Sequence, residues 1–216
     1  MNLPKKMSFK LLSVFLFLSL SVTSVWSESF TSDGKDYSLR IGGGYSDLND
    51  LGQILMFDFN TYSGDTYVVN VDAGWRMYEQ AFDLPIDIYL KGGVSYFNEN
   101  NFQNDIYEAT VYFKAYYNID AWDNRMRLGV GEGLSWASGV PYVERVDAQK
   151  DNGEVAKFLN YLEFSFDFDL GRLVGVESLK DVYVGYTIKH RSGAFGLFSG
   201  VHGGCNYKML TIETKF

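Results

Sequence analysis

The 216-residue sequence contains a single cysteine, three prolines and two histidines. One cysteine excludes an internal disulfide framework and a cysteine-based zinc cluster. The histidines, His190 and His202, occur without a pattern of carboxylates around them, so we expect no metal site and no cofactor. Basic side chains are also few: 19 against 27 acidic ones leave a net charge of −8. This charge argues against a nucleic-acid partner, because nucleic acid is bound by basic surfaces.

The sequence also lacks an apolar run long enough for a membrane-spanning helix, which needs about 20 residues. Its longest run, Leu11–Val25, is shorter, follows a lysine-rich start and ends near the small residue Ser27. This order of segments is typical of a secretory signal peptide. We therefore expect residues 1–27 to be a cleaved signal peptide and residues 28–216 to be the folded domain of an exported protein.

Aromatic residues, by contrast, are abundant at 17% of the chain, and most segments alternate between apolar and polar residues. From Thr66 to Met77 the odd-numbered positions hold Tyr, Val, Val, Ala, Trp and Met, and the even-numbered positions hold Thr, Val, Asn, Asp, Gly and Arg. We call this odd or even placement the parity of a residue. A period of two residues is that of a β-strand with two different faces. The pattern predicts strands near residues 65–78, 85–97, 105–118, 124–137, 157–169, 181–191 and 205–216, and an eighth within 36–61, where 37–45 and 53–59 both alternate.

Two architectures use such strands. A soluble sandwich hides the apolar faces between two sheets, whereas a membrane barrel turns them to lipid and keeps a polar interior. Several predicted strands reach the length of about 9–11 residues that spans a bilayer, against about five or six in soluble sheets. The chain also ends on Phe216, like the C-terminal signature of bacterial outer-membrane barrels. We therefore predict an antiparallel transmembrane β-barrel in the bacterial outer membrane, inserted by the barrel assembly machinery.

The number of strands is predicted to be eight, with ten as the alternative, because bacterial single-chain barrels have even numbers. Side chains fill the interior of a barrel of that size, so an open channel is not expected. With the C-terminus on the periplasmic side, the long segments 138–156 and 192–204 are expected outside the cell.

Residues capable of chemistry occur near the C-terminus. His190 and Ser192 are two apart on a predicted strand, so their side chains point to the same side, and the parity of that strand makes it the lipid-facing side. Asn160 and Asn206 also have outward parity on the two adjoining strands. We expect these four side chains to converge on the outside of the barrel, at the height of the lipid headgroups.

This group of residues has two interpretations. In the first, Ser192 is a nucleophile and His190 its general base, with Asn160 orienting the imidazole. The Gly193 N–H and the Asn206 side chain then stabilise an oxyanion, and Asn160 is a further candidate for binding the substrate or the oxyanion. In the second, the membrane interface simply tolerates polar residues beside a glycine-rich loop, and the protein is a structural or adhesive barrel.

The strand that carries His190-Arg191-Ser192, its place near the end of a small barrel and the glycine-rich hairpin after it resemble the lipid A 3-O-deacylase family. That family has the motif His-x-Ser-Asn, in which His is the base and Ser the nucleophile on the lipid-facing wall. His190 and Ser192 match these two roles, but Gly193 replaces the motif's asparagine. The family's downstream acid should fall at residues 204–206, where Asn206 is the nearest match. Further similar stretches are 131–136, 158–162 and 190–198.

The resemblance implies an outer-membrane esterase that removes the ester-linked 3-O acyl chain from lipid A, the lipid part of lipopolysaccharide. The substrate, like other outer-membrane lipids, would reach the site from the membrane, with its acyl chains along the last three strands.

Two glutamates are candidates for the missing acid. Glu132 has outward parity, where a bare carboxylate is costly in a membrane. Either a bulge at Gly131 or Gly133 turns it inward, which we favour, or it has a partner on the outer wall. Glu144 lies in a long outer loop that can fold over the site or leave the charge solvated.

The opposite parity of the strands carries charged residues that we expect to form ion pairs inside the barrel: Arg125, Arg127, Glu163 and Asp167. Cys205 shares the inward parity and is expected to be a small buried residue rather than a nucleophile.

Overall fold

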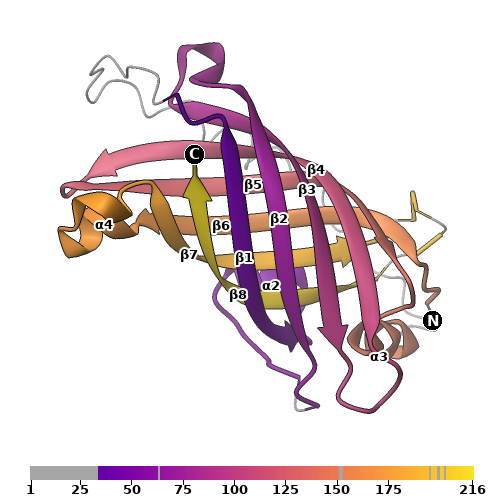
Figure 1. The fold of residues 1–216 in the computed structure, drawn as a ribbon. Helices are drawn as coiled ribbons and strands as arrows, with labels where there is room; N and C mark the ends of the chain where they lie inside the picture. Colours follow the sequence, from indigo (N-terminus) through magenta and orange to yellow (C-terminus); the bar gives the residue numbers. More distant parts are fainter. Residues whose placement is uncertain (1–33, 63, 151–152, 195, 199, 202) are drawn as a thin grey trace. The chain divides into compact units, whose positions relative to one another are not determined.

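The computed structural model describes residues 34–216 except 63, 151–152, 195, 199 and 202. The predicted signal peptide, residues 1–27, lies outside the described residues. Within the described part, eight antiparallel strands form a closed barrel, in which each strand pairs with its neighbours in sequence and the first pairs with the last (Figure 1). The strands are β1 (Tyr37–Asp47), β2 (Tyr67–Tyr78), β3 (Ile86–Asn98), β4 (Ile106–Ala121), β5 (Asn124–Ala137), β6 (Phe158–Asp169), β7 (Val182–Ser192) and β8 (Gly204–Lys215).

This architecture confirms the predicted all-β, eight-stranded antiparallel barrel and is incompatible with a two-sheet sandwich. The alternating segment 53–59 is not a strand, because a short helix, α2 (Leu51–Leu55), begins just before it. The Gln53 side chain accepts a hydrogen bond of 3.0 Å from the Asp50 N–H, which closes a capping box at the start of this helix. The alternation in this segment therefore does not come from an extended chain.

The two faces of the strands differ as the sequence predicts. Outward positions carry exposed apolar side chains; for example, Val94 is 62% and Leu210 is 74% exposed. Inward positions are buried even where they are charged, as in Arg40 and Lys114, both at 0% exposure. An apolar exterior around a polar interior is the arrangement of a transmembrane barrel.

Ion pairs and tyrosines fill the interior. Arg127 pairs with Asp167 at 3.1 Å, and Arg40 pairs with Glu163 at 2.6 Å, which places three of the four predicted network residues inside the barrel. Arg125 is different: it pairs with Asp120 at 2.7 Å beside the tight β4–β5 turn. Its side chain lies at the rim because it is only the second residue of β5.

The two ends of the barrel carry different connections. At one end, which we call the loop end, lie the long connections β1–β2, β3–β4, β5–β6 and β7–β8; the β5–β6 connection contains α3 (Tyr142–Lys150). At the other end, where β8 finishes, lie the 3-10 helices η2 (Ala81–Asp83) and η3 (Glu177–Leu179) and the helix α4 (Leu170–Val174). Among the described residues, no helix is long and apolar enough to cross a membrane.

Candidate functional site

His190 and Asn206 lie directly opposite each other on the paired strands β7 and β8. The His190 Nδ1 atom is 2.7 Å from the Asn206 Oδ1 atom. Both residues have outward parity, and Asn206 is nevertheless only 5% exposed. The side chain that contacts the imidazole is therefore Asn206, the nearest match to the acid of the lipid A 3-O-deacylases, and not Asn160, which was expected from strand parity to orient the ring.

A second hydrogen bond fixes the tautomer of the histidine. The Asn206 Nδ2 atom donates to the backbone carbonyl of Asn49 at 2.9 Å, so the amide turns its oxygen toward the ring. An amide oxygen can only accept, and therefore Nδ1 of His190 carries the hydrogen. In the neutral ring this leaves the lone pair on Nε2, which is the atom that a general base uses.

Ser192 is half-buried at the loop end of β7. Its Oγ accepts a long hydrogen bond of 3.4 Å from the Ala194 N–H. Two residues along a strand separate α-carbons by about 6.6 Å, and among the described residues no hydrogen bond joins the His190 ring to the Ser192 hydroxyl. The two groups thus share one face of one strand, two residues apart.

Asn160 is paired with Ser192 across β6 and β7, but its amide points the other way, toward β5. Its Nδ2 atom donates to the Glu132 carboxylate and to the Gly133 carbonyl, the latter at 3.2 Å. Both amide hydrogens are therefore used, and Asn160 has none left for an oxyanion. The predicted roles of Asn160 in the oxyanion site and in orienting the imidazole do not fit this geometry.

The expected bulge beside Glu132 is wrong. The β4–β5 and β5–β6 registers run through it without a shift, and Glu132 points outward, exposed, with Asn160 as its partner. The flanking glycines have another reason: a Cβ on Gly133 would lie 2.2 Å from the Val111 carbonyl oxygen, and one on Gly131 would lie 2.7 Å from the Cγ of Glu163. Gly133 thus allows close approach of the β4 backbone, and Gly131 makes room for the Glu163 side chain inside the barrel.

Glu144 is neither solvated nor part of the outer-wall site. It lies on α3, is 1% exposed, and pairs with Arg191 at 3.1 Å. Arg191 stands between His190 and Ser192 in sequence but points to the opposite face, into the barrel. Burial raises the pKa of Glu144 to about 6, although Arg191 favours its charged form. Cys205, 2% exposed, lies on the same inner side, as predicted.

Gly193 does not have a free backbone donor. Its N–H donates to the Gly203 carbonyl at 3.2 Å and continues the β7–β8 hairpin. A Cβ at this position would lie 1.8 Å from the Val201 carbonyl oxygen, so the hairpin needs glycine here for close packing. The predicted oxyanion role of the Gly193 N–H therefore does not fit. His202 lies outside the described residues.

Sequence reasoning missed Asn49, whose carbonyl positions Asn206. It lies just after β1, in residues 48–62, which we call the β1–β2 cover. The cover bonds to the outer wall a second time through Thr61, whose Oγ1 accepts from Lys208 Nζ at 2.6 Å. No periodic signal marks such a loop contact, although the capping box of Asp50 and Gln53 does mark a turn there.

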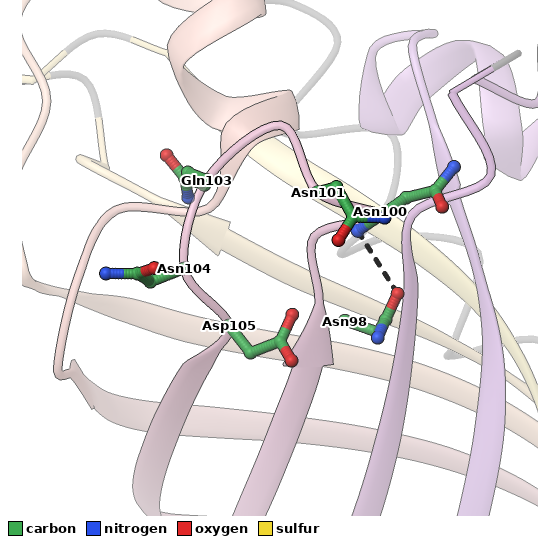
Figure 2. A pocket seen from close by; sticks show the side chains of 6 residues that line it. All are labelled: Asn98, Asn100, Asn101, Gln103, Asn104 and Asp105. Atoms are coloured by element: carbon green, nitrogen blue, oxygen red, sulfur yellow. Dashed lines mark hydrogen bonds between the residues drawn. The ribbon is translucent and has the colours of Figure 1, made fainter.

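A separate polar pocket lies in the β3–β4 connection at the loop end (Figure 2). Amide side chains and one carboxylate line it: Asn98, Asn100, Asn101, Gln103, Asn104 and Asp105. The Asn100 N–H donates to Asn98 Oδ1 at 3.1 Å, the bond drawn in Figure 2. None of the predicted site residues lines this pocket.

Two solved structures are similar to this fold. A crystal structure of the outer membrane enzyme PagL matches with a TM-score of 0.54 at 13% identity, over 83% of this chain and 99% of that one. The fold of the present chain is therefore that of an outer-membrane barrel. A crystal structure of Neisserial surface protein A, NspA, matches with a TM-score of 0.45 at 9% identity, over 83% of this chain and 97% of that one. No family model and no curated protein matches the sequence.

Proposed function

We propose that this protein is an outer-membrane esterase that removes the 3-O acyl chain from lipid A. The observation that carries the proposal is the chain of hydrogen bonds from the Asn49 carbonyl through Asn206 to His190, which holds the ring as a base beside Ser192. The resemblance of the His190-Arg191-Ser192 strand to the lipid A 3-O-deacylases supplies the substrate. The outer-membrane enzyme PagL shares the fold.

In the proposed reaction, Ser192 Oγ attacks the ester carbonyl of the acyl chain and passes its proton to His190 Nε2. His190 returns that proton to the leaving sugar oxygen, and water then hydrolyses the acyl-enzyme in the same two steps. Ala194, whose N–H already points at Ser192 Oγ, is the backbone donor that we assign to the oxyanion.

Asn206 takes the place of a triad carboxylate. It orients the imidazole and fixes its tautomer, as the asparagine of Cys-His-Asn proteases does. A neutral amide stabilises the imidazolium less than a carboxylate does, so we expect a slow enzyme. Neither glutamate acts on the histidine in this proposal: Glu132 orients Asn160, and Glu144 holds Arg191.

The location of the site favours a lipid substrate. Ser192 and His190 lie on the outer wall, which continues into the apolar exterior of β6, β7 and β8. A substrate in the outer leaflet can present its ester there while its acyl chains follow that exterior. Export by a cleaved signal peptide and insertion by the barrel assembly machinery belong to the same proposal.

Mass spectrometry of lipid A after incubation with the purified, detergent-solubilised protein tests the proposal. We expect loss of one hydroxyacyl chain with the natural protein and none with Ser192→Ala or His190→Ala. Thr214→Ala, which removes an outward hydroxyl from the far end of β8, is the matched control and should retain activity. Deacylation that persists in Ser192→Ala excludes this mechanism.

The alternative function is a non-catalytic structural or adhesive barrel. The polar pocket of the β3–β4 connection favours it, because exposed amides at the loop end can bond polar groups of a partner. This function predicts that Ser192→Ala and His190→Ala leave lipid A and cell phenotype unchanged, whereas shortening of residues 99–105 alters binding.

A further inference from the structure

Part of the outer wall beside His190 is shielded, although its residues have outward parity. Ile188 is 6% and Asn206 is 5% exposed, and the Lys208 side chain is 14% exposed. Further along β8, on the same face, Leu210 is 74% and Ile212 is 42% exposed. Something therefore covers β7 and β8 only near the site.

The β1–β2 cover, residues 48–62, provides this shield. Besides the bonds of Asn49 and Thr61, the Phe59 ring lies 6.3 Å from the Tyr186 ring of β7 and 5.0 Å from Lys208 Nζ. Lys208 also pairs with Asp47 at 2.7 Å, and Asp47 in turn accepts from the Asn60 N–H at 3.1 Å. The cover is thus tied to the outside of β8 and β7, and its helix α2 is marked in Figure 1.

The cover itself has two faces. Ile54, on α2, is 1% exposed, whereas Met56 and Phe57 just after it are 82% and 83% exposed. Phe57 has a φ of 63°, the left-handed conformation that reverses the chain at the end of a helix. This reversal places two large apolar side chains on the outer tip of a segment that lies on the lipid-facing wall.

We propose that the β1–β2 cover is a membrane-inserted element whose Met56 and Phe57 side chains bind among the acyl chains of the outer leaflet next to the His190 site. Lipid acyl chains are the expected contact because the cover adjoins the apolar exterior of the barrel. The cover packs on Tyr186, and Leu210, the cross-strand partner of Tyr186, is an exposed part of that exterior. Met and Phe are suited to this contact, since one is flexible and both are apolar. Insertion rests on the barrel fold and not on the esterase function.

Depth-dependent quenching tests the insertion directly. Phe57→Cys, in a Cys205→Ser background, is labelled with an environment-sensitive fluorophore and reconstituted into vesicles that contain lipids spin-labelled on the acyl chain. Val94→Cys on the outer wall and Asn104→Cys in the β3–β4 connection are the lipid-exposed and water-exposed references. We expect the label at position 57 to be quenched as strongly as that at 94 and at least threefold more than that at 104.

Two outcomes overturn the proposal. Quenching at position 57 no greater than at 104 would place the tip in water. Loss of quenching in the labelled protein, together with disulfide-linked dimers of the unlabelled Phe57→Cys variant under oxidising conditions at high lipid-to-protein ratio, would assign the tip to contact with a second copy of the chain.

A second experiment links the cover to the proposed function. The double variant Met56→Ser/Phe57→Ser should lower hydrolysis of lipid A in vesicles about tenfold and leave hydrolysis of a short, water-soluble ester unchanged. Equal loss on both substrates contradicts a lipid-contacting role. If the natural protein hydrolyses neither substrate, the esterase proposal fails while the quenching result still decides the insertion.

Discussion

The imidazole of His190 and the amide of Asn206 face each other across two paired strands, with Nδ1 and Oδ1 2.7 Å apart. The amide cannot turn over, because its nitrogen is bonded to the Asn49 carbonyl. A loop contact on the outside of the barrel therefore holds the amide that sets the tautomer of this histidine.

Removal of the Asn206 amide should impair catalysis. We expect Asn206→Ala to lower kcat on lipid A about 10²-fold, because the ring loses its orientation and tautomer. Asn206→Asp should retain or raise kcat, since a carboxylate accepts the same hydrogen bond and stabilises the imidazolium. Steady-state kinetics in mixed micelles measures both; an Asn206→Ala variant with natural kcat contradicts the assigned role.

The Asn160–Glu132 pair should stabilise the outer wall. Asn160→Leu leaves the Glu132 carboxylate without its side-chain donor, and we expect the free energy of unfolding to fall by about 1–3 kcal/mol. Urea titration of the barrel in detergent micelles measures this change.

The matched control for this pair is the double variant Asn160→Leu/Glu132→Gln. Because its side chain at position 132 is uncharged, it should recover part of the loss. If Asn160→Leu and the double variant are equally unstable, the carboxylate is not the source of the effect.

Glu163 should be among the most sensitive positions inside the barrel. Arg40 donates to it at 2.6 Å, Tyr161 at 2.7 Å, and Lys114 also bonds to it. Glu163→Gln leaves buried cations without their counter-charge, which costs about 3–5 kcal/mol of unfolding free energy. Asp120→Asn removes one charge that pairs with Arg125 at the rim and should cost at most about 1 kcal/mol; similar losses for both variants would contradict this distinction.

The helix α3 should be more stable against local unfolding at acidic than at alkaline pH. Burial raises the pKa of Glu99, which accepts from the Tyr142 N–H at 2.9 Å at the start of α3, to about 7, and that of Glu144 to about 6. Both values exceed the ordinary 4.5, so the folded state holds protons more tightly than the unfolded state. The resulting stabilisation is complete below pH 4.5 and is lost as pH rises through 6 to 7.

Amide hydrogen exchange of residues 142–150, corrected for the intrinsic rate, measures this dependence. Protection should decrease between pH 5 and pH 8 in the natural protein and depend less on pH in Glu99→Gln, which keeps an acceptor for the Tyr142 N–H. Protection that increases with pH would show that the ionised carboxylates stabilise the helix.

Alternation in the sequence predicted much of the barrel and part of the site. Because side chains alternate sides along a strand, and each strand pairs with its neighbour in sequence, parity placed His190, Ser192 and Asn206 on the outer wall. The same rule placed Arg127, Glu163 and Asp167 inside. These are consequences of a period of two and of short connections, which are local properties of the chain.

The partners within those faces were not predictable in the same way. Parity does not say which neighbour a side chain bonds. Asn160 was therefore expected to orient the imidazole, although the family resemblance pointed to Asn206, and Glu132 was expected to turn inward. Glu144 was expected near the site or in solvent, yet α3 buries it against Arg191. Each of these depends on which way a side chain turns, and packing of the neighbouring strands or of a loop decides that.

The sequence by itself thus determined a barrel with an apolar exterior, a polar interior and a His–Ser pair on the outer face. It could do so because the alternation of apolar and polar residues is a local property of each strand. Only the tertiary structure decided that Asn49 locks Asn206 onto His190 and that residues 48–62 cover the wall beside them. The Asn49–Asn206 bond joins the β1–β2 cover to β8 across 157 residues of sequence, and it forms only once closure of the barrel brings the first and last strands together.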